Sequence, residues 1–172
     1  MCVISSAKKK YLKYLKNQEV LEQPFQDKHG QFENYYLPIC KSIYQNYLRK
    51  NKKVTIVGLS GAQGSGKTTI TEILKIILKE KYNLNTVSFS IDDFYKTLSE
   101  RKKLSIKSHR LFLTRGVPGT HDIKLLSKTF KKLQKKNFRK FVIPKFDKSK
   151  DDRMVKRKWT VIKHKPEIVI FE

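Results

Sequence analysis

Three short apolar runs, rich in β-branched residues, stand out along the chain. They cover Val54–Leu59, Thr86–Ile91 and Glu167–Glu172. Continuous apolar runs of this length are typical of strands buried on both faces of a parallel sheet. Two shorter β-like pieces, 141–143 and 159–162, lie on either side of a charged excursion. The pattern predicts an α/β fold, with a parallel sheet flanked by helices.

Helical periodicity separates these runs. After Lys67, apolar residues recur at i, i+3, i+4 and i+7, which is one face of a helix; they are Ile70, Ile73, Leu74 and Ile77. A helix between the first two strands makes a βαβ unit with a right-handed crossover. Thr120 or Asp122 can cap a further amphipathic helix. We expect that helix to carry four apolar side chains inward: Ile123, Leu126, Phe130 and Leu133.

The segments outside this pattern are more polar. Residues 1–50 are predicted to form a helical extension, in which Pro38 occupies the first turn of a helix. Within it, Gln23–Asn34 reads as a polar connector, and further on Leu98–Arg115 reads as basic and irregular. The predicted division is an extension over 1–50 and an α/β domain over 51–172.

Composition narrows the class of protein. The chain has 172 residues, 38% of them hydrophobic, and a net charge of +24. The lysines are scattered along the chain, which favours a solvated surface over a nucleic-acid footprint. No apolar run approaches membrane-spanning length. Cys2 and Cys40 are too few for a disulfide scaffold or zinc site, so we expect free thiols and a cytoplasmic location.

The most specific motif is a phosphate-binding loop. The residues from Gly61 to Thr68 fit G-x-x-x-x-G-K-[ST] without a mismatch. In such a loop Lys67 reaches the β- and γ-phosphates, and the hydroxyl of Thr68 holds Mg²⁺. The motif predicts ATP and Mg²⁺ as ligands. The residues expected to bind the nucleotide are Gly61, Ala62, Gln63, Gly64, Ser65, Gly66, Lys67, Thr68 and Thr69.

Carboxylates follow two of the predicted strands. We expect Asp92 to act as the general base that takes a proton from a substrate hydroxyl, together with Lys67 as a catalytic residue. Asp93 is the better candidate for capping the next segment. Glu172 is expected near Mg²⁺ with Thr68, although a plain strand-end glutamate is the alternative. Because ligands of α/β sheets bind beyond the carboxyl ends of the strands, Lys67, Asp92 and Glu172 are predicted to converge.

A loop rich in Gly and Pro precedes the predicted amphipathic helix. Arg115 can clamp a carboxylate or phosphate, and His121 and Asp122 complete the expected substrate-binding set with Asp92. The alternative is a helix-entry turn with a surface arginine. A weaker polar cluster follows further on, made of Asp147, Lys148, Asp152 and Arg153.

These motifs together resemble a known family. The loop Gly58–Thr69 and the segment Ser90–Tyr95 are similar to those of the D-glycerate 3-kinase family, within the uridine kinase, phosphoribulokinase and pantothenate kinase group. The segments Arg115–Asp122 and Pro144–Ser149 resemble the glycerate branch more particularly. The resemblance implies a P-loop kinase that phosphorylates a small acid, most simply D-glycerate, with Asp92 rather than Asp93 as base.

The same resemblance leaves alternatives open. The family continues past the acidic strand Ile168–Glu172 with a basic lid and further strands, so we expect this sequence to be an incomplete kinase domain. Uridine or pantothenate is the alternative acceptor. An inactive nucleotide-binding fragment and a basic nucleic-acid-associated P-loop protein are the other two interpretations. The partner is predicted to be a small molecule, with no membrane, and the sequence does not indicate an oligomeric state.

Overall fold

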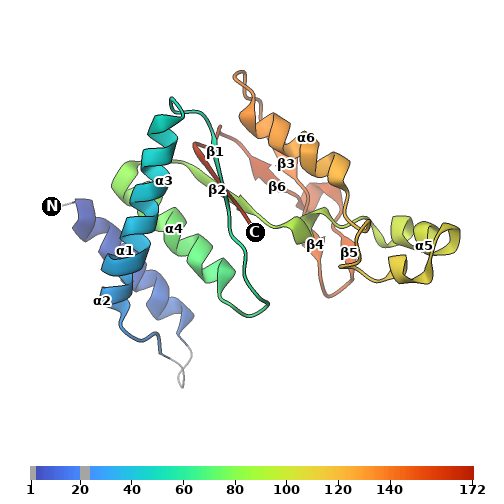
Figure 1. Ribbon diagram of the computed structural model, residues 1–172, viewed down its shortest axis with the longest axis horizontal. Helices are drawn as coiled ribbons and strands as arrows, with labels where there is room; N and C mark the ends of the chain where they lie inside the picture. Colours follow the sequence, from blue (N-terminus) through green and yellow to red (C-terminus); the bar gives the residue numbers. More distant parts are fainter. Residues whose placement is uncertain (1–2, 20–23) are drawn as a thin grey trace. The chain divides into compact units, whose positions relative to one another are not determined.

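The computed structural model of the protein describes residues 3–19 and 24–172 (Figure 1). The chain divides into two compact units, which are described separately below. The first unit contains residues 1–88 and 166–172, and the second contains residues 89–165. None of the helices in the described residues is long and apolar enough to cross a membrane.

The sheet has three strands in the order β1-β7-β2: β1 is Thr55–Gly58, β2 is Thr86–Phe89 and β7 is Ile168–Phe171. Strands β1 and β7 are parallel, with Thr55 opposite Ile168. Three consecutive residues of the central strand β7, Ile168, Val169 and Ile170, are fully buried. Burial on both faces explains why this run is apolar without alternation. The predicted parallel sheet and its helices are confirmed, and each strand lies within two residues of its predicted bounds.

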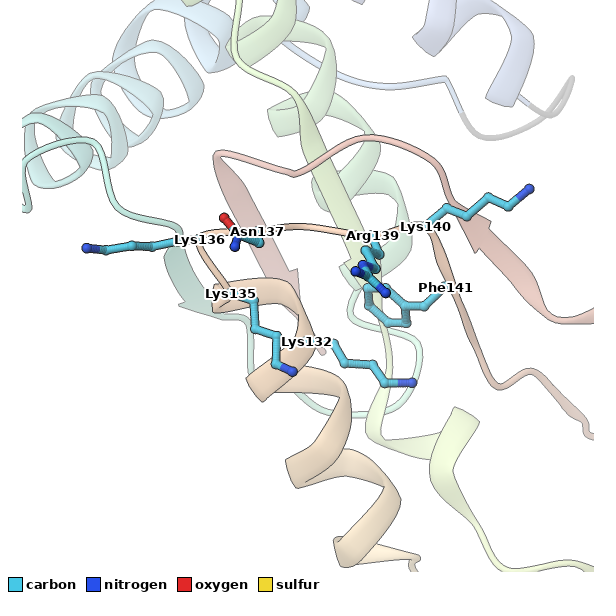
Figure 2. Close-up of a pocket in the computed structure, with 7 residues that line it drawn as sticks. All are labelled: Lys132, Lys135, Lys136, Asn137, Arg139, Lys140 and Phe141. Atoms are coloured by element: carbon cyan, nitrogen blue, oxygen red, sulfur yellow. The ribbon is translucent and has the colours of Figure 1, made fainter.

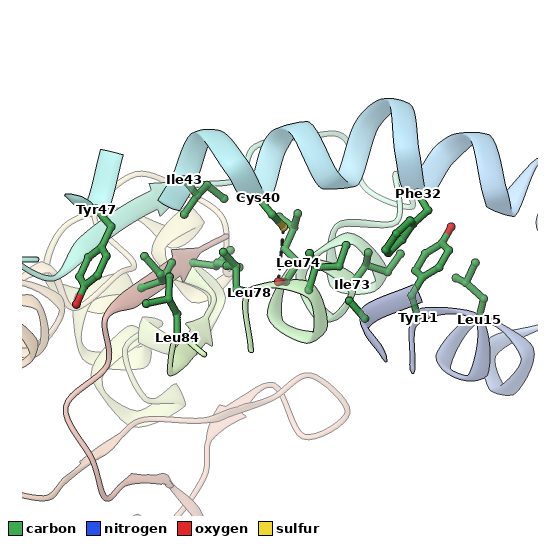
Figure 3. Close-up of a cluster of buried hydrophobic side chains, with 14 residues drawn as sticks. Tyr11, Leu15, Phe32, Cys40, Ile43, Tyr47, Ile73, Leu74, Leu78 and Leu84 are labelled. Carbon is green, nitrogen blue, oxygen red and sulfur yellow. Dashed lines mark hydrogen bonds between the residues drawn. The ribbon is translucent and has the colours of Figure 1, made fainter. Parts of the chain in front are cut away.

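Three long helices belong to the first unit: α1 (Val3–Gln18), α3 (Leu37–Arg49) and α4 (Lys67–Tyr82). Helix α1 places Ala7, Tyr11 and Leu15 on one face at intervals of four residues, and all three are buried. Helix α4 contacts both α1 and α3. Figure 3 shows the resulting core, in which side chains of these helices point toward one another. The predicted α4 face is confirmed at Ile73, Leu74 and Ile77.

Gln23–Asn34 was predicted to be a connector, and this prediction is wrong over most of the segment. Position 23 lies outside the described residues. The segment contains α2 (Lys28–Gln31) and the start of the π-helix η1 (Phe32–Tyr36), which leads into α3. Asp27 caps α2 by accepting a hydrogen bond from the Gly30 N–H. Phe32 is buried against the Tyr11 ring at a centroid distance of 5.0 Å. This buried aromatic residue orders a stretch whose other residues are mostly polar.

The predicted extension over residues 1–50 packs in the same unit as the phosphate-binding loop. Tyr11 and Leu15 of α1 belong to one buried cluster with Ile73 and Leu78 of α4. The helices of the extension therefore contribute to the core that supports α4. The division at residue 51 stays a prediction.

The second unit is built from two antiparallel pairs and two helices. Strand β3 (Phe141–Ile143) pairs with β6 (Thr160–Ile162), and β4 (Phe146–Asp147) pairs with β5 (Asp152–Arg153). The short hairpin β4–β5 lies inside the segment expected to be a charged excursion. A 3-10 turn, η4 (Lys156–Lys158), leads from the hairpin toward β6.

The prediction that Leu98–Arg115 is irregular is wrong. The segment forms helix α5 (Leu98–Lys107) and the 3-10 turn η3 (Arg110–Leu113). A capping box opens α5, because Thr97 accepts from the Glu100 N–H and the Glu100 carboxylate accepts from the Thr97 N–H. The buried residue of α5 is Arg101. A helix anchored by a buried arginine lacks the apolar periodicity from which helices are predicted.

Helix α6 (Ile123–Gln134) follows the Gly- and Pro-rich loop. Of the two predicted caps, Thr120 and Asp122, the structure has Asp122. Its carboxylate accepts a hydrogen bond from the Leu125 N–H at 2.9 Å. Leu133 is fully buried, as expected, whereas Ile123 is 59% exposed and its predicted inward position is wrong. The buried face runs through Thr129 instead, whose hydroxyl donates to the Leu125 carbonyl and so satisfies its polar group inside the unit.

Candidate nucleotide and acceptor sites

The phosphate-binding loop connects β1 to α4 in the first unit. Gly64 and Gly66 have φ angles of 79° and 76°, in the left-handed region that favours glycine. Gly66 is the N-cap of α4, so the loop ends where the helix begins. The first turn of α4 leaves backbone N–H groups without intrahelical partners and carries partial positive charge. The backbone therefore has the strand–loop–helix form that the motif requires to bind phosphates.

Lys67 is the first residue of α4 and folds back over the loop. Its Nζ donates hydrogen bonds to the carbonyl oxygens of Gly61 and Ala62, at 2.8 and 2.7 Å. The ammonium thus lies against the same loop whose glycines shape the backbone. This arrangement brings a positive charge and the free N–H groups of a helix together, which is the chemistry that recognises a phosphate chain.

Glu172 follows β7 and is hydrogen-bonded to α4. The Thr71 hydroxyl donates to the Glu172 carboxylate at 2.8 Å, and Thr71 itself is buried. Thr68 and Thr71 are three residues apart, so both lie on one face of α4. The predicted metal-binding pair, Thr68 and Glu172, is therefore brought to the same end of this helix.

The donor set of this pair fits Mg²⁺ bound through a substrate. The described residues contain no group of three or more His, Cys, Asp or Glu side chains that could hold a metal ion by themselves. Mg²⁺ is usually held by one or two carboxylates together with substrate phosphates and water. One hydroxyl and one carboxylate beside a phosphate-binding loop match that pattern.

The second unit begins with a capping box at the end of β2. Ser90 accepts a hydrogen bond from the Asp92 N–H, and the Asp93 carboxylate accepts from the Ser90 N–H. This turns the chain into the 3-10 helix η2 (Ile91–Phe94), so β2 ends two residues earlier than predicted. Asp93 is buried and also accepts from the Phe146 N–H at 3.2 Å and from the Lys145 Nζ. It therefore has the capping role predicted for it.

Asp92 has the opposite environment, because its side chain is 33% exposed. Lys148 pairs with it at 2.8 Å from Nζ to the carboxylate. Burial, the Asp92 charge and a hydrogen bond with the Asp92 carboxylate together raise the pKa of Tyr95. Asp92 thus keeps an accessible carboxylate that a lysine and a tyrosine hold in place.

His121 stacks on Tyr95, with ring centroids 4.1 Å apart and planes inclined by 25°. The two residues also form an isolated antiparallel bridge. Burial lowers the pKa of His121, against the effect of the Asp92 charge, which raises it. Its Nε2 is buried and has no hydrogen-bond partner among residues 3–19 and 24–172. This enclosed imidazole is better placed to support Tyr95 than to meet a substrate, and its substrate-binding role stays a prediction.

Arg115 is held in place by a shared aspartate. Its Nη1 lies 2.8 Å from the Asp151 carboxylate, and its guanidinium lies over the Phe146 ring at 5.9 Å. The buried Arg101 binds the other oxygen of the Asp151 carboxylate at 2.9 Å and also donates to the Leu113 carbonyl. Arg115 remains 37% exposed. A planar cation thus stands in a fixed position with part of its surface in solvent.

Asp122 is engaged at both carboxylate oxygens. One oxygen caps α6, and the other lies 3.5 Å from Arg153. Arg153 in turn donates two hydrogen bonds to the Tyr95 carbonyl, at 2.9 and 2.6 Å. These contacts give Asp122 a structural position behind Tyr95, and its predicted contact with substrate has no separate support.

The two units each hold part of the predicted site. Lys67, Thr68 and Glu172 belong to the first unit, and Asp92 and Arg115 belong to the second, with His121 and Asp122. The predicted convergence of Lys67, Asp92 and Glu172 stays a prediction. The sequence did not predict the contributions of Tyr95, Arg101 and Asp151. It placed Lys148 in a weaker polar cluster, without predicting its pairing with Asp92. Tyr95 lies within the quoted segment Ser90–Tyr95, which is a signal that could have found it.

Comparisons with known proteins identify similar kinases. The chain is 40% identical over 97 residues to the uncharacterized kinase mug58 of Schizosaccharomyces pombe. The matched stretch covers 55% of this chain and 35% of that protein. It is 38% identical over 107 residues to the probable ATP-dependent kinase TDA10 of Saccharomyces cerevisiae, covering 58% of this chain and 37% of that protein.

A solved structure is also similar. D-glycerate 3-kinase from Cryptococcus neoformans superposes with a TM-score of 0.68 at 27% identity, over 80% of this chain and 51% of that one. The chain thus spans about a third of the length of the curated relatives it matches and half of the solved kinase. Its residues 56–172 match the family described as Phosphoribulokinase / Uridine kinase. This match covers more than half of the chain, and the protein therefore belongs to the phosphoribulokinase / uridine kinase family.

Proposed function

We propose that the protein is an ATP- and Mg²⁺-dependent kinase that phosphorylates a hydroxyl of a small acid, with D-glycerate as the acceptor. The observation that carries the proposal is the phosphate-binding loop. It has left-handed glycines at positions 64 and 66 and a lysine folded over its carbonyls, directly before a helix N-terminus. Membership of the phosphoribulokinase / uridine kinase family supports phosphoryl transfer to an alcohol.

The chain's residues divide the work of this reaction. The N–H groups of the loop and the Lys67 ammonium bind the phosphates of ATP. Thr68 and Glu172 would hold Mg²⁺ together with the phosphates, and the bound ion would neutralise charge on the phosphate oxygens. In the transfer, the acceptor oxygen forms a bond to the γ-phosphorus, and the bond from that phosphorus to the β–γ bridging oxygen breaks. The products are ADP and a phosphate ester.

Asp92 receives the proton that the acceptor hydroxyl loses. Its carboxylate is partly accessible, and the Lys148 ammonium pairs with it at 2.8 Å. A positioned base of this kind contributes a factor of about 10²–10⁴ to the rate. Tyr95 fixes the direction of the carboxylate through its hydrogen bond. Asp92 therefore serves as the catalytic residue of the second unit, and Tyr95 as its positioning residue.

Arg115 supplies the preference for an acid. Asp151 and Phe146 fix its guanidinium, so little conformational entropy is lost when it binds an anion. A carboxylate can accept two hydrogen bonds from such a cation. The similarity to D-glycerate 3-kinase from Cryptococcus neoformans supports glycerate among small hydroxy acids.

A coupled assay of ADP release tests the proposal. Purified protein is incubated with Mg-ATP and D-glycerate, and in parallel with uridine or pantothenate. We expect turnover with D-glycerate, and a loss of about 100-fold or more in kcat for Asp92→Asn. Turnover equal in Asp92→Asn and the unchanged protein would reject the role of Asp92. Turnover with uridine or pantothenate but not with D-glycerate would reject D-glycerate as the acceptor, while the proposed kinase activity would stand.

A further inference from the structure

A cavity of about 630 Å³ lies in the second unit, where α6 ends and the chain turns into β3. Figure 2 shows its lining, which comes from a single stretch of ten residues, 132–141. Five of the seven lining residues are cationic and none is acidic; the seven are Lys132, Lys135, Lys136, Asn137, Arg139, Lys140 and Phe141. Most of the side chains that line the cavity are thus cationic.

These five charges are not neutralised within the described part of the chain. None of them takes part in an ion pair among residues 3–19 and 24–172. The surrounding unit cannot neutralise them either. Residues 89–165 contain 24 lysines and arginines against 7 aspartates and glutamates, which leaves a net charge of +17. Like charges gathered in a concave site raise the local concentration of anions.

The cavity also offers neutral recognition groups. Phe141 is half-buried, and the Lys132 Nζ lies 5.4 Å from the centroid of its ring. The Phe138 ring is T-shaped to it at a centroid distance of 5.9 Å. Asn137 adds an amide that can both donate and accept hydrogen bonds. An aromatic face, an amide and several cations together suit a ligand with a planar or apolar part and a chain of phosphates.

We propose that this cavity binds a multiply phosphorylated small molecule of nucleotide size, separately from the phosphate-binding loop. Its volume lies in the range of small-molecule sites, roughly 300–1,000 Å³. A single-stranded nucleic acid would instead need a basic groove that follows an extended backbone. A lining confined to one helix end and one turn fits the smaller ligand.

The site is also separate from the acceptor cluster. Asp122 caps α6 at one end, and the cavity lies at the other end of this 12-residue helix. At a rise of 1.5 Å per residue the two ends are about 18 Å apart. A ligand in the cavity would therefore lie about one helix length from Asp122, although it would contact the helix that Asp122 caps.

The experiment first weakens phosphate binding at the phosphate-binding loop, by replacing Lys67 with alanine. In a Lys67→Ala background, isothermal titration measures the affinity for inorganic tripolyphosphate. The variant K135E/R139E reverses two charges of the cavity, and K102E/K103E makes the same change in charge on the exposed face of α5. We expect the cavity variant to bind tripolyphosphate at least roughly tenfold more weakly. The α5 control should change the affinity less than about twofold, because it alters only the general field.

Three outcomes would overturn the proposal. The first is no measurable binding of tripolyphosphate by the Lys67→Ala protein. The second is equal weakening by the cavity variant and the α5 control, which would mean a diffuse field only. The third is tighter binding of a labelled single-stranded RNA than of tripolyphosphate, with an affinity that rises with RNA length, which would indicate a nucleic-acid surface. Circular dichroism of each variant establishes that it is folded.

Discussion

The Thr71 hydroxyl lies 2.8 Å from the Glu172 carboxylate, so the second turn of α4 is hydrogen-bonded to the residue after β7. These residues are 101 positions apart in the sequence. The bond joins the helix that follows the phosphate-binding loop to the carboxylate expected near Mg²⁺. It therefore couples the local stability of the loop to the position of a candidate metal ligand.

Replacing Thr71 tests this coupling. In Thr71→Val the buried hydroxyl is lost with little change in volume, and the carboxylate loses a donor. Hydrogen bonds to charged groups contribute about 1.5–3 kcal/mol, so we expect the free energy of unfolding to fall by about 1.5 kcal/mol in urea denaturation. Glu172→Gln, which keeps an acceptor oxygen, should cost less. Equal stability of Thr71→Val and the unchanged protein would contradict the bond.

Two glycines of the first unit, Gly66 in the phosphate-binding loop and Gly58 in β1, offer a matched pair. Gly66 has a φ of 76°, whereas Gly58 in β1 has no positive φ and no atom within 4 Å of an added Cβ. Gly66→Ala should therefore lose about 1 kcal/mol of unfolding free energy, because an alanine is strained in the left-handed region. Gly58→Ala should be neutral or slightly stabilising. Thermal unfolding of both variants measures the difference, and a similar loss in both would argue against the loop conformation.

Arg101 is predicted to be the structural centre of the second unit. It is fully buried and donates to the Leu113 carbonyl and to the carbonyl and carboxylate of Asp151. Arg101→Met removes the donor of all these hydrogen bonds and leaves Arg115 as the partner of the Asp151 carboxylate, so we expect a loss of at least about 2 kcal/mol in unfolding free energy. Lys102→Met, one residue along and exposed, should change stability by less than about 0.5 kcal/mol. Comparable values for the two would show that the buried contacts contribute little.

The pH dependence of stability should reflect His121. Burial lowers its pKa in the folded protein, so the unfolded chain binds the proton more readily. The contribution of the neutral imidazole is complete above the unfolded pKa of about 6.5 and is lost as pH falls through the folded pKa. Unfolding at pH 7.5 and 5.5 should show a smaller pH effect in His121→Gln. The exposed His164, replaced in the same way, should leave the pH effect unchanged.

Tyr95 offers a test of positioning during turnover. Tyr95→Phe keeps the ring stacked on His121 and removes the hydroxyl that bonds to Asp92. We expect kcat with D-glycerate to fall by about tenfold, with KM nearly unchanged, because the carboxylate loses its fixed direction. A rise in KM without a change in kcat would instead mean that the hydroxyl contacts the acceptor.

The parts that the sequence predicts well are those that depend on neighbouring residues. The three apolar runs, the phosphate-binding loop and the cap at Asp122 are each determined within about a dozen positions. The helix α5 escaped prediction because a buried arginine anchors it, and its bonds reach 50 residues along the chain to Asp151. Likewise Lys148 pairs with Asp92 through folding, which no spacing rule could indicate.

Asp151 has a consequence for how the protein can change over evolution. One carboxylate serves both the buried Arg101 and the exposed Arg115. A mutation that retunes the acceptor preference through this aspartate also weakens the anchor of α5. Selection for a new acceptor would therefore act more readily on Arg115 itself, or on residues around it, than on the aspartate that holds it.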